Sequence, residues 1–185
     1  MEVIEAIHAR QSIGRVRQDP VPRDAIEKLL GAAVQAPNHY EVRPWRFVVL
    51  TGEGRNRLGD VLANALRQRF PDIEPSALEK ERAKPLRAPV IIAVGVDLPL
   101  DPRVHETENI CAVAAACQNI LLAAVDLGLA VQWRTGEAAR DADVKKFLGF
   151  SPAQHLLAFL YVGYPETLAG VRQRAGFEDR TVWMD

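Results

Sequence analysis

Apolar residues recur at the three- and four-residue spacing of amphipathic helices in several parts of the chain. A short helix over Val3 to Ile7 leads to the polar triplet Arg10-Gln11-Ser12. A second helix starts near Pro22 and ends before Pro37, because the residue preceding a proline disfavours helical geometry. The same spacing predicts helices around Leu58 to Leu66, Glu106 to Leu127 and Asp141 to Leu148. Glu106 to Leu127 has so little polar surface that we expect it to be buried on most sides.

Four short apolar runs predict strands, at residues 46–50, 90–96, 130–133 and 156–162. The run 90–96 is apolar on both faces, which predicts a central strand covered on each side. Thr51 to Gly54 resembles the start of a dinucleotide-binding loop, but Arg57 stands where the third glycine is needed, so we expect an ordinary turn. Residues 71–89 are charged and rich in proline, which predicts a short exposed helix and leaves open whether it moves as a flap.

Composition narrows the class of protein. At 185 residues and 48% hydrophobic, the chain is predicted to form one domain, residues 1–185, with a single core. A net charge of −1 gives no basic surface for nucleic acid. The acidic start lacks the features of a secretory signal and the run Ile110 to Cys117 is too short to span a bilayer, so we expect a cytoplasmic protein with no membrane contact.

Cysteine and histidine spacing gives no sign of a metal site or a disulfide. Cys111 and Cys117 are six residues apart on one predicted helix, where they point to different faces, so we expect two small buried hydrophobic side chains. No two of the four histidines have the spacing of metal ligands.

The loop between the second predicted helix and the first predicted strand has an unusual set of side chains. From Gln35 to Leu50 it reads Q-A-P-N-H-Y-E-V-R-P-W-R-F-V-V-L. Aromatic faces and hydrogen-bond donors gather on His39, Tyr40, Arg43, Trp45 and Arg46. A loop held between a helix and a strand is a favourable place for a binding site, and this set suits a flat ligand with polar edges.

Several motifs in this order resemble the nitroreductase family of flavin enzymes. They are a helix ending in Arg10-Gln11-Ser12, a helix started by proline, A-P-x-H ending at His39, and P-W-x-F-x-V starting at Pro44. Gly128 to Gly136, G-L-A-V-Q-W-R-T-G, is similar to the small single-domain branch of that family. Arg43 departs from the pattern, because many members have glutamine before P-W.

The resemblance implies a three-layer α+β fold of the nitroreductase type, with helices flanking a mostly antiparallel sheet, assembled as a homodimer with one FMN at each interface site. It implies ping-pong transfer of electrons from NADH or NADPH to a nitroaromatic, a quinone or a similar small acceptor. No protein nucleophile or general acid is expected, because the cofactor carries the redox chemistry.

The resemblance also implies which residues contact the flavin. Arg10 and Ser12 are expected at the phosphate, which needs cations and hydrogen-bond donors, and Gln11 between them is expected to contact the cofactor. The turn Trp133-Arg134-Thr135 is expected to reach N5 through backbone N–H groups, with Arg134 offsetting negative charge. Gln35 and His39 are expected to approach from the facing subunit. Without the resemblance, Arg10 would be interpreted as a solvated arginine, Trp133 as structural, and Arg134 as paired with Glu137 or Asp141.

Two other functions stay open at this stage. One is a flavin-binding sensor or carrier that does not turn over. The other is an unrelated hydrolase-like α/β domain, which the missing G-x-S-x-G motif disfavours. The C-terminal residues 165–185 lack periodicity, but their apolar Phe177, Val182 and Trp183 predict packing against a partner chain.

Overall fold

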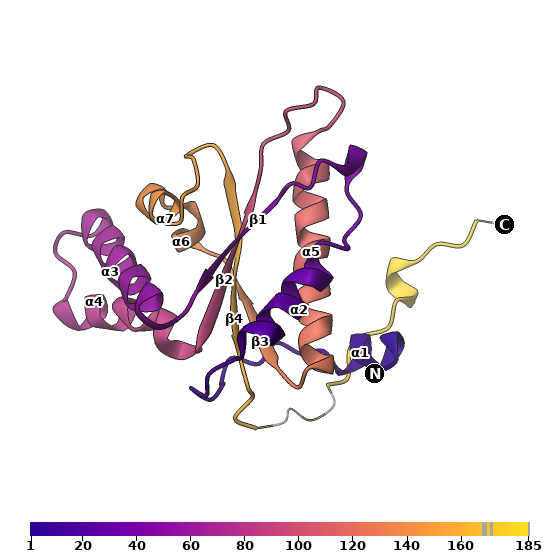
Figure 1. Cartoon of the computed structure of the whole chain (residues 1–185), viewed down its shortest axis with the longest axis horizontal. Helices are drawn as coiled ribbons and strands as arrows, with labels where there is room; N and C mark the ends of the chain where they lie inside the picture. The colour runs from indigo at the N-terminus through magenta and orange to yellow at the C-terminus, as the bar shows by residue number, and fades with distance from the viewer. Residues whose placement is uncertain (168–169, 171, 185) are drawn as a thin grey trace.

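The computed structural model describes residues 1–167, 170 and 172–184. At its centre is a four-stranded sheet in the order β1-β2-β4-β3. The strands are β1 (Trp45–Leu50), β2 (Val90–Val96), β3 (Ala130–Arg134) and β4 (His155–Gly163). Each neighbouring pair is antiparallel, which confirms the expected sheet (Figure 1). All seven residues of β2 are buried, as its apolar pattern predicts for a central strand.

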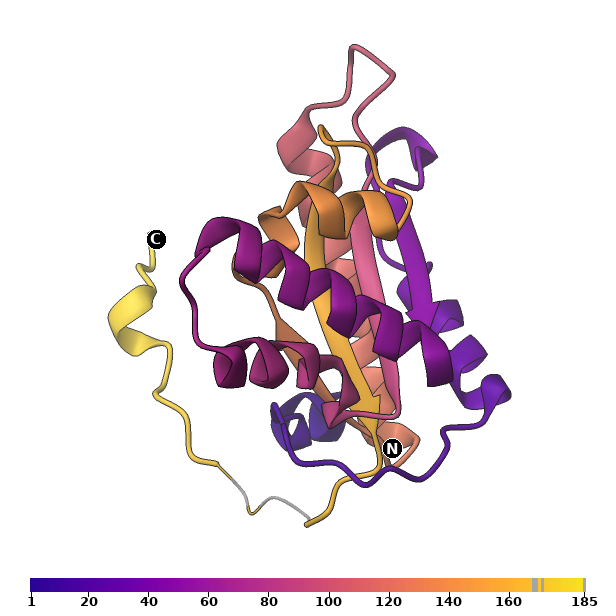
Figure 2. The same ribbon diagram turned by 90° about the vertical axis from the view of Figure 1, so that its left-hand side faces the viewer.

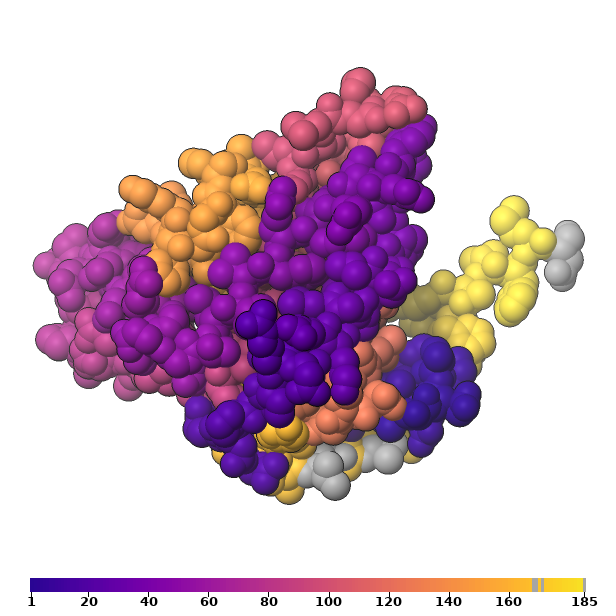
Figure 3. All heavy atoms as spheres, in the orientation of Figure 1, coloured from indigo at the N-terminus to yellow at the C-terminus, as the bar shows by residue number. Residues whose placement is uncertain are grey.

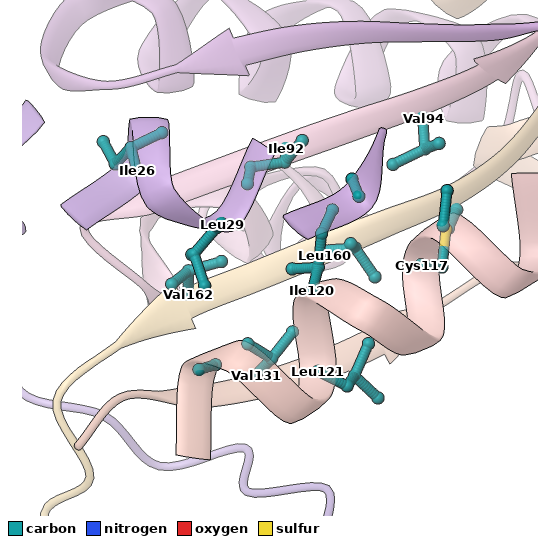
Figure 4. Close-up of a cluster of buried hydrophobic side chains, with 14 of the residues drawn as sticks. Ile26, Leu29, Ile92, Val94, Cys117, Ile120, Leu121, Val131, Leu160 and Val162 are labelled. Atoms are coloured by element: carbon teal, nitrogen blue, oxygen red, sulfur yellow. The ribbon is translucent and has the colours of Figure 1, made fainter. Parts of the chain in front are cut away.

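One face of the sheet is covered by α2 (Arg23–Ala33) and α5 (Glu106–Asp126), with α1 (Val3–Ala9) beside α5. Figure 4 shows the core between them, where Leu29 and Ile120 meet Ile92 and Leu160 from the sheet. The buried residues of α5 recur every three or four positions and form one stripe along the helix. The expectation that α5 is buried on most sides is therefore wrong for the single chain, because its other face is open.

Cys111 lies on this open face of α5 and is exposed, whereas Cys117 is buried in the core. The expectation of two buried cysteines is therefore wrong for Cys111, because only one face of the helix packs on the sheet. Both thiols are free, and the described residues contain no group of three or more histidine, cysteine, aspartate or glutamate side chains placed to hold a metal ion.

The opposite face is covered by α3 (Gly52–Arg69), α6 (Glu137–Arg140) and α7 (Ala142–Phe147) (Figure 2). A second hydrophobic core lies beneath them, so the expectation of a single core is wrong, because a central sheet with helices on both faces has an apolar layer on each side. These two covered faces confirm the three-layer α+β fold. Outside α3 lie α4 (Pro75–Arg82), which is the expected short helix, and the 3-10 turn η2 (Lys84–Arg87). Gly59 lets α3 and α4 approach closely, because a Cβ there would overlap the Arg82 carbonyl oxygen.

Two elements on this side differ from the prediction. The expected turn at Thr51 to Gly54 is wrong, because α3 already begins at Gly52 and includes both glycines in its first turn. The helix α6 was not predicted, because four residues are too few for a periodic pattern. The predicted helix at Asp141 is confirmed as α7, with the Asp141 side chain accepting hydrogen bonds from Asp143 N and Val144 N.

By length and composition α5 is apolar enough to cross a bilayer, with a mean hydropathy of 1.5 over its most apolar window. Helices in the core of globular proteins meet the same criterion, and 44% of this window is buried inside the fold. Packing on the sheet and on α2 accounts for the buried stripe of this helix.

The C-terminal segment projects from the body of the molecule beside α1, as the yellow atoms in Figure 3 show. It contains the 3-10 turn η3 (Glu178–Arg180). Phe177 and Trp183 are 63% and 78% exposed. Packing of this segment against a partner chain remains a prediction.

Candidate functional site

The segment that follows α1 runs along the outer edge of β3. Ser12 and Val131 form a parallel bridge between the two. Gly14 lies where the segments are closest, and a Cβ there would be 2.7 Å from Gln132 Oε1. The structure therefore brings the polar triplet Arg10-Gln11-Ser12 beside the strand that ends in the Trp133 turn.

Two arginines meet at the end of α1. Arg10 is the C-cap residue, and Arg174 Nη2 donates to the Arg10 carbonyl oxygen at 3.4 Å. Gln11 Nε2 donates to the Gly170 carbonyl oxygen at 2.6 Å and holds the same C-terminal segment in place. Burial, and secondarily the charge of Arg174, lower the pKa of Arg10, and no acidic group of the described residues opposes them. Two guanidinium groups without a counter-ion make a site for an anion such as phosphate.

A cavity of about 380 Å³ opens at the end of β3, on the face of the sheet that α3 covers. Residues from α3, from the segment around η2 and from the turn after β3 line it. Its basic side chains are Arg69, Lys84, Arg87 and Arg134. The volume is in the usual range of ligand pockets, about 300 to 1,000 Å³.

Ion pairs neutralise some of these basic groups but not others. Arg69 is paired with Glu137 at 3.6 Å and with Asp141 at 3.5 Å. Since Arg69 takes both carboxylates, the alternative that Arg134 pairs with them is wrong. Arg134 instead donates from Nε and Nη2 to the neutral Gln132 Oε1, at 3.2 and 3.1 Å. Its positive charge is therefore available at the cavity.

Tyr161 lies in the cavity wall near two cations. Burial raises the pKa of its phenol, while the charges of Arg134 and Arg87 act in the opposite direction. The adjoining turn is fixed by Gly136, whose φ of 102° and ψ of −161° suit glycine alone. The backbone of Thr135 and Gly136 lines the cavity beside these side chains.

The Trp133 side chain does not share this cavity. Successive side chains of a strand point to opposite faces, and Trp133 packs against the core beneath α2 and α5. Only its backbone is available at the cavity side, so Trp133 fixes the turn by packing.

Gln35 and His39 lie elsewhere in the single chain. His39 Nδ1 is 4.0 Å from Glu108 Oε1 in the first turn of α5, whereas Arg10 lines a cleft with Val125 near the end of the same helix. A rise of about 1.5 Å per residue places those two positions roughly 25 Å apart along the helix. Within one chain, the triplet Arg10-Gln11-Ser12 lies along the β3 edge that leads to Arg134 and Thr135, whereas His39 lies at the other end of α5.

The loop around His39 has a strained backbone. Tyr40, Glu41 and Arg43 have φ values of 47°, 53° and 51°, in the left-handed region that favours glycine. Asn38 Oδ1 accepts a hydrogen bond from Arg43 N–H at 2.8 Å and supports this conformation. Strain of this kind, about 1 to 3 kcal/mol per residue, is concentrated at functional sites.

Sequence reasoning missed Arg174, Lys84, Arg87 and Tyr161. Arg174 lies in a tail without periodicity and meets Arg10 across 164 positions of the chain, so no local pattern indicates the contact. Lys84 and Arg87 come from the charged segment 71–89, for which we predict a short exposed helix or a flap but no binding residue. Tyr161 lies in an apolar strand, and alternation along that strand was the one signal that could have found it.

Comparison with known proteins assigns the chain to a family. The family model described as Nitroreductase family matches residues 7–164. The chain belongs to the nitroreductase family. It is an FMN-dependent oxidoreductase, as the members of this family are.

Individual relatives agree with this assignment. "Putative NAD(P)H nitroreductase YdjA" from Escherichia coli (strain K12) is 30% identical over 169 residues, which cover 91% of each chain. The crystal structure of the nitroreductase-like family protein from Bacillus cereus has a TM-score of 0.84 at 25% identity, covering 100% of this chain and 97% of that chain. A "putative nitroreductase in complex with fmn" from Desulfovibrio desulfuricans has a TM-score of 0.77 at 26% identity, covering 100% and 98%.

The residues of this nitroreductase fit FMN on structural grounds of their own. The partly buried Arg10 and its neighbour Arg174 have no counter-ion among the described residues, and a phosphate would supply one. The cavity has room for a ring system and keeps the charge of Arg134 beside the backbone of Thr135.

Proposed function

We propose that this nitroreductase is a cytoplasmic homodimer of single-domain chains that passes two electrons from NADH or NADPH to a nitroaromatic, a quinone or a similar small acceptor. The observation that carries the proposal is the pairing of Arg10 with Arg174 on the same strand edge as the cavity of Arg134. Such a layout offers one end of FMN an anion site and the other end a pocket with a positive wall.

Bound FMN supplies the chemistry, because it accepts a hydride and passes on two electrons. Arg10 and Arg174 hold its phosphate, with the Ser12 hydroxyl as a further donor. Arg134, which Gln132 holds in place, stabilises the negative charge that reduction develops at the ring edge. The backbone at Thr135 donates toward the ring centre.

A two-fold dimer accounts for the positions of Gln35 and His39. If two α5 helices pack antiparallel through their open faces, the start of one lies against the end of the other. The partner subunit's His39 then comes close to Arg10, although roughly 25 Å separates these two groups in one chain, and the partner subunit's Gln35 comes from the same loop. The exposed Cys111 and the groove between His39 and α5 become buried in this assembly.

Mixed dimers test the shared site. Arg10→Glu repels the phosphate, and His39→Glu places an acid beside the ring edge. Each variant alone is expected to be inactive. In a mixed dimer one site collects both changes and its twin collects neither, so refolding the two together in equal amounts should restore about a quarter of wild-type activity with random pairing. If the mixed dimer forms and stays inactive, each flavin belongs to a single chain.

The reaction itself is tested with purified protein and identified cofactor. NADH and NADPH should bleach the flavin absorbance, and menadione or nitrofurazone should restore it fast enough to support turnover. Restoration that is far slower than turnover with every quinone and nitroaromatic would favour the alternative, a flavin-binding sensor or carrier.

A further inference from the structure

A second cavity lies between α2, the first turn of α3 and the start of β2, and shares no lining residue with the cavity described above. Its volume is about 680 Å³. Val21, Ile26, Leu30 and Val49 give it apolar walls, and Gln18 and Arg55 are among its polar groups. A pocket of this size with mostly apolar walls and a few converging polar groups is typical of a small-molecule site.

Arg55 carries the charge of this cavity without a counter-ion. Its Nη1 donates to the Ala88 carbonyl oxygen at 2.6 Å and is 3.4 Å from Gln18 Oε1, and both acceptors are neutral. Its Nε is buried and has no hydrogen-bond partner among the described residues. The protein covers Nε, so a ligand in the cavity meets the guanidinium at its Nη atoms, whose charge has no carboxylate partner among the described residues.

The start of α3 adds donors to the same place. Thr51 and Gly52 line the cavity, and the Thr51 side chain makes no capping hydrogen bond. The first turn of this 18-residue helix carries the positive end of its dipole, which favours an anion nearby. The start of α3 and the Arg55 side chain therefore line one cavity.

Neighbouring charges limit the ligand to a single negative charge. Arg23 and Glu27 at the cavity are paired at 2.8 Å, so Arg23 is already neutralised. Glu53 lies in the first turn of α3 and would repel a multiply charged anion. One unpaired guanidinium beside apolar walls matches a carboxylate on an apolar body.

We propose that this cavity binds a small monocarboxylate with an apolar or aromatic body. The carboxylate pairs with the Arg55 guanidinium beside the start of α3, and the body lies against Ile26, Leu30 and Val49. The site is independent of the flavin assignment, because none of its residues takes part in it.

The test measures the affinity of FMN-loaded protein for benzoate by isothermal titration calorimetry. The neutral isostere benzamide is the matched control ligand. Benzoate is expected to bind at least tenfold more tightly than benzamide. Two variants should each weaken benzoate binding at least tenfold. Arg55→Met keeps the length of the side chain and removes its charge. Val49→Glu places a carboxylate on a wall residue that is already 37% exposed. Arg67→Ala, on the exposed side of the same helix, should leave benzoate binding unchanged.

Benzoate could also enter the flavin cavity, so its position is measured directly. A crystal with 4-iodobenzoate should place the iodine signal between Ile26 and Val49 with the carboxylate at Arg55. Iodine found only beside Arg134, or benzoate affinity that neither Arg55→Met nor Val49→Glu changes, would overturn the proposal. If Arg55→Met does not fold, Val49→Glu and the crystal decide it.

Discussion

The two arginines at the end of α1 allow a sharp prediction about cofactor affinity. Arg10→Ala or Arg174→Ala removes one charge-assisted contact to the FMN phosphate, worth about 1.5 to 3 kcal/mol. At about 1.4 kcal/mol per factor of ten, FMN should bind roughly 10- to 150-fold more weakly. The stability of the flavin-free protein should change little, because Arg174 is exposed and its hydrogen bond to the Arg10 carbonyl oxygen is long, 3.4 Å, and exposed to solvent.

Fluorescence quenching during titration of flavin-free protein measures this loss. Riboflavin lacks the phosphate, so its affinity should be the same in the wild type and in both variants. Arg67→Ala removes an exposed arginine of α3 and is the matched control for charge. The reasoning fails if both variants bind FMN as the wild type does, or if riboflavin affinity falls as far as FMN affinity.

Two further predictions concern packing and kinetics. Gly59→Ala forces α3 away from the Arg82 carbonyl and should lower the free energy of unfolding, measured in urea, by about 1 to 3 kcal/mol. The control Gly31→Ala on α2 meets open space and should raise the free energy of unfolding by about 0.5 to 1 kcal/mol. Equal changes in the two variants would contradict the close approach at Gly59. Steady-state rates with both substrates varied should give parallel double-reciprocal lines, because nicotinamide and acceptor use one exposed ring face in turn, and intersecting lines would exclude a shared face.

The sequence predicted the sheet and its main helices because their apolar spacing is local information. It misplaced the start of α3, because glycine costs about 1 kcal/mol in a helix interior and was interpreted as a turn signal at Gly52 and Gly54. It also overstated the burial of α5. An apolar helix face has the same sequence pattern whether the core of its own chain covers it or it lies open for another subunit.

The candidate site was predictable in part. The motifs located Arg10, Ser12 and Arg134, and the structure places them along one strand edge. Successive side chains of a strand alternate between faces, so Trp133 and Arg134 cannot both face the cavity. This could have been deduced from the sequence. Arg174 could not, because its contact with Arg10 depends on how distant segments pack.

In the proposed dimer, the strained loop after α2 would link two equilibria, assembly and cofactor retention. Within the chain, the left-handed backbone around Tyr40 is supported by the Asn38 to Arg43 hydrogen bond and by Arg103, whose guanidinium lies 4.1 Å from the Tyr40 ring centroid. A partner that contacts the loop would add to this support and shift the population toward the strained form. Dilution that separates the subunits would then release the loop and the flavin together, so the fraction of protein holding cofactor would depend on protein concentration as well as on the concentration of FMN.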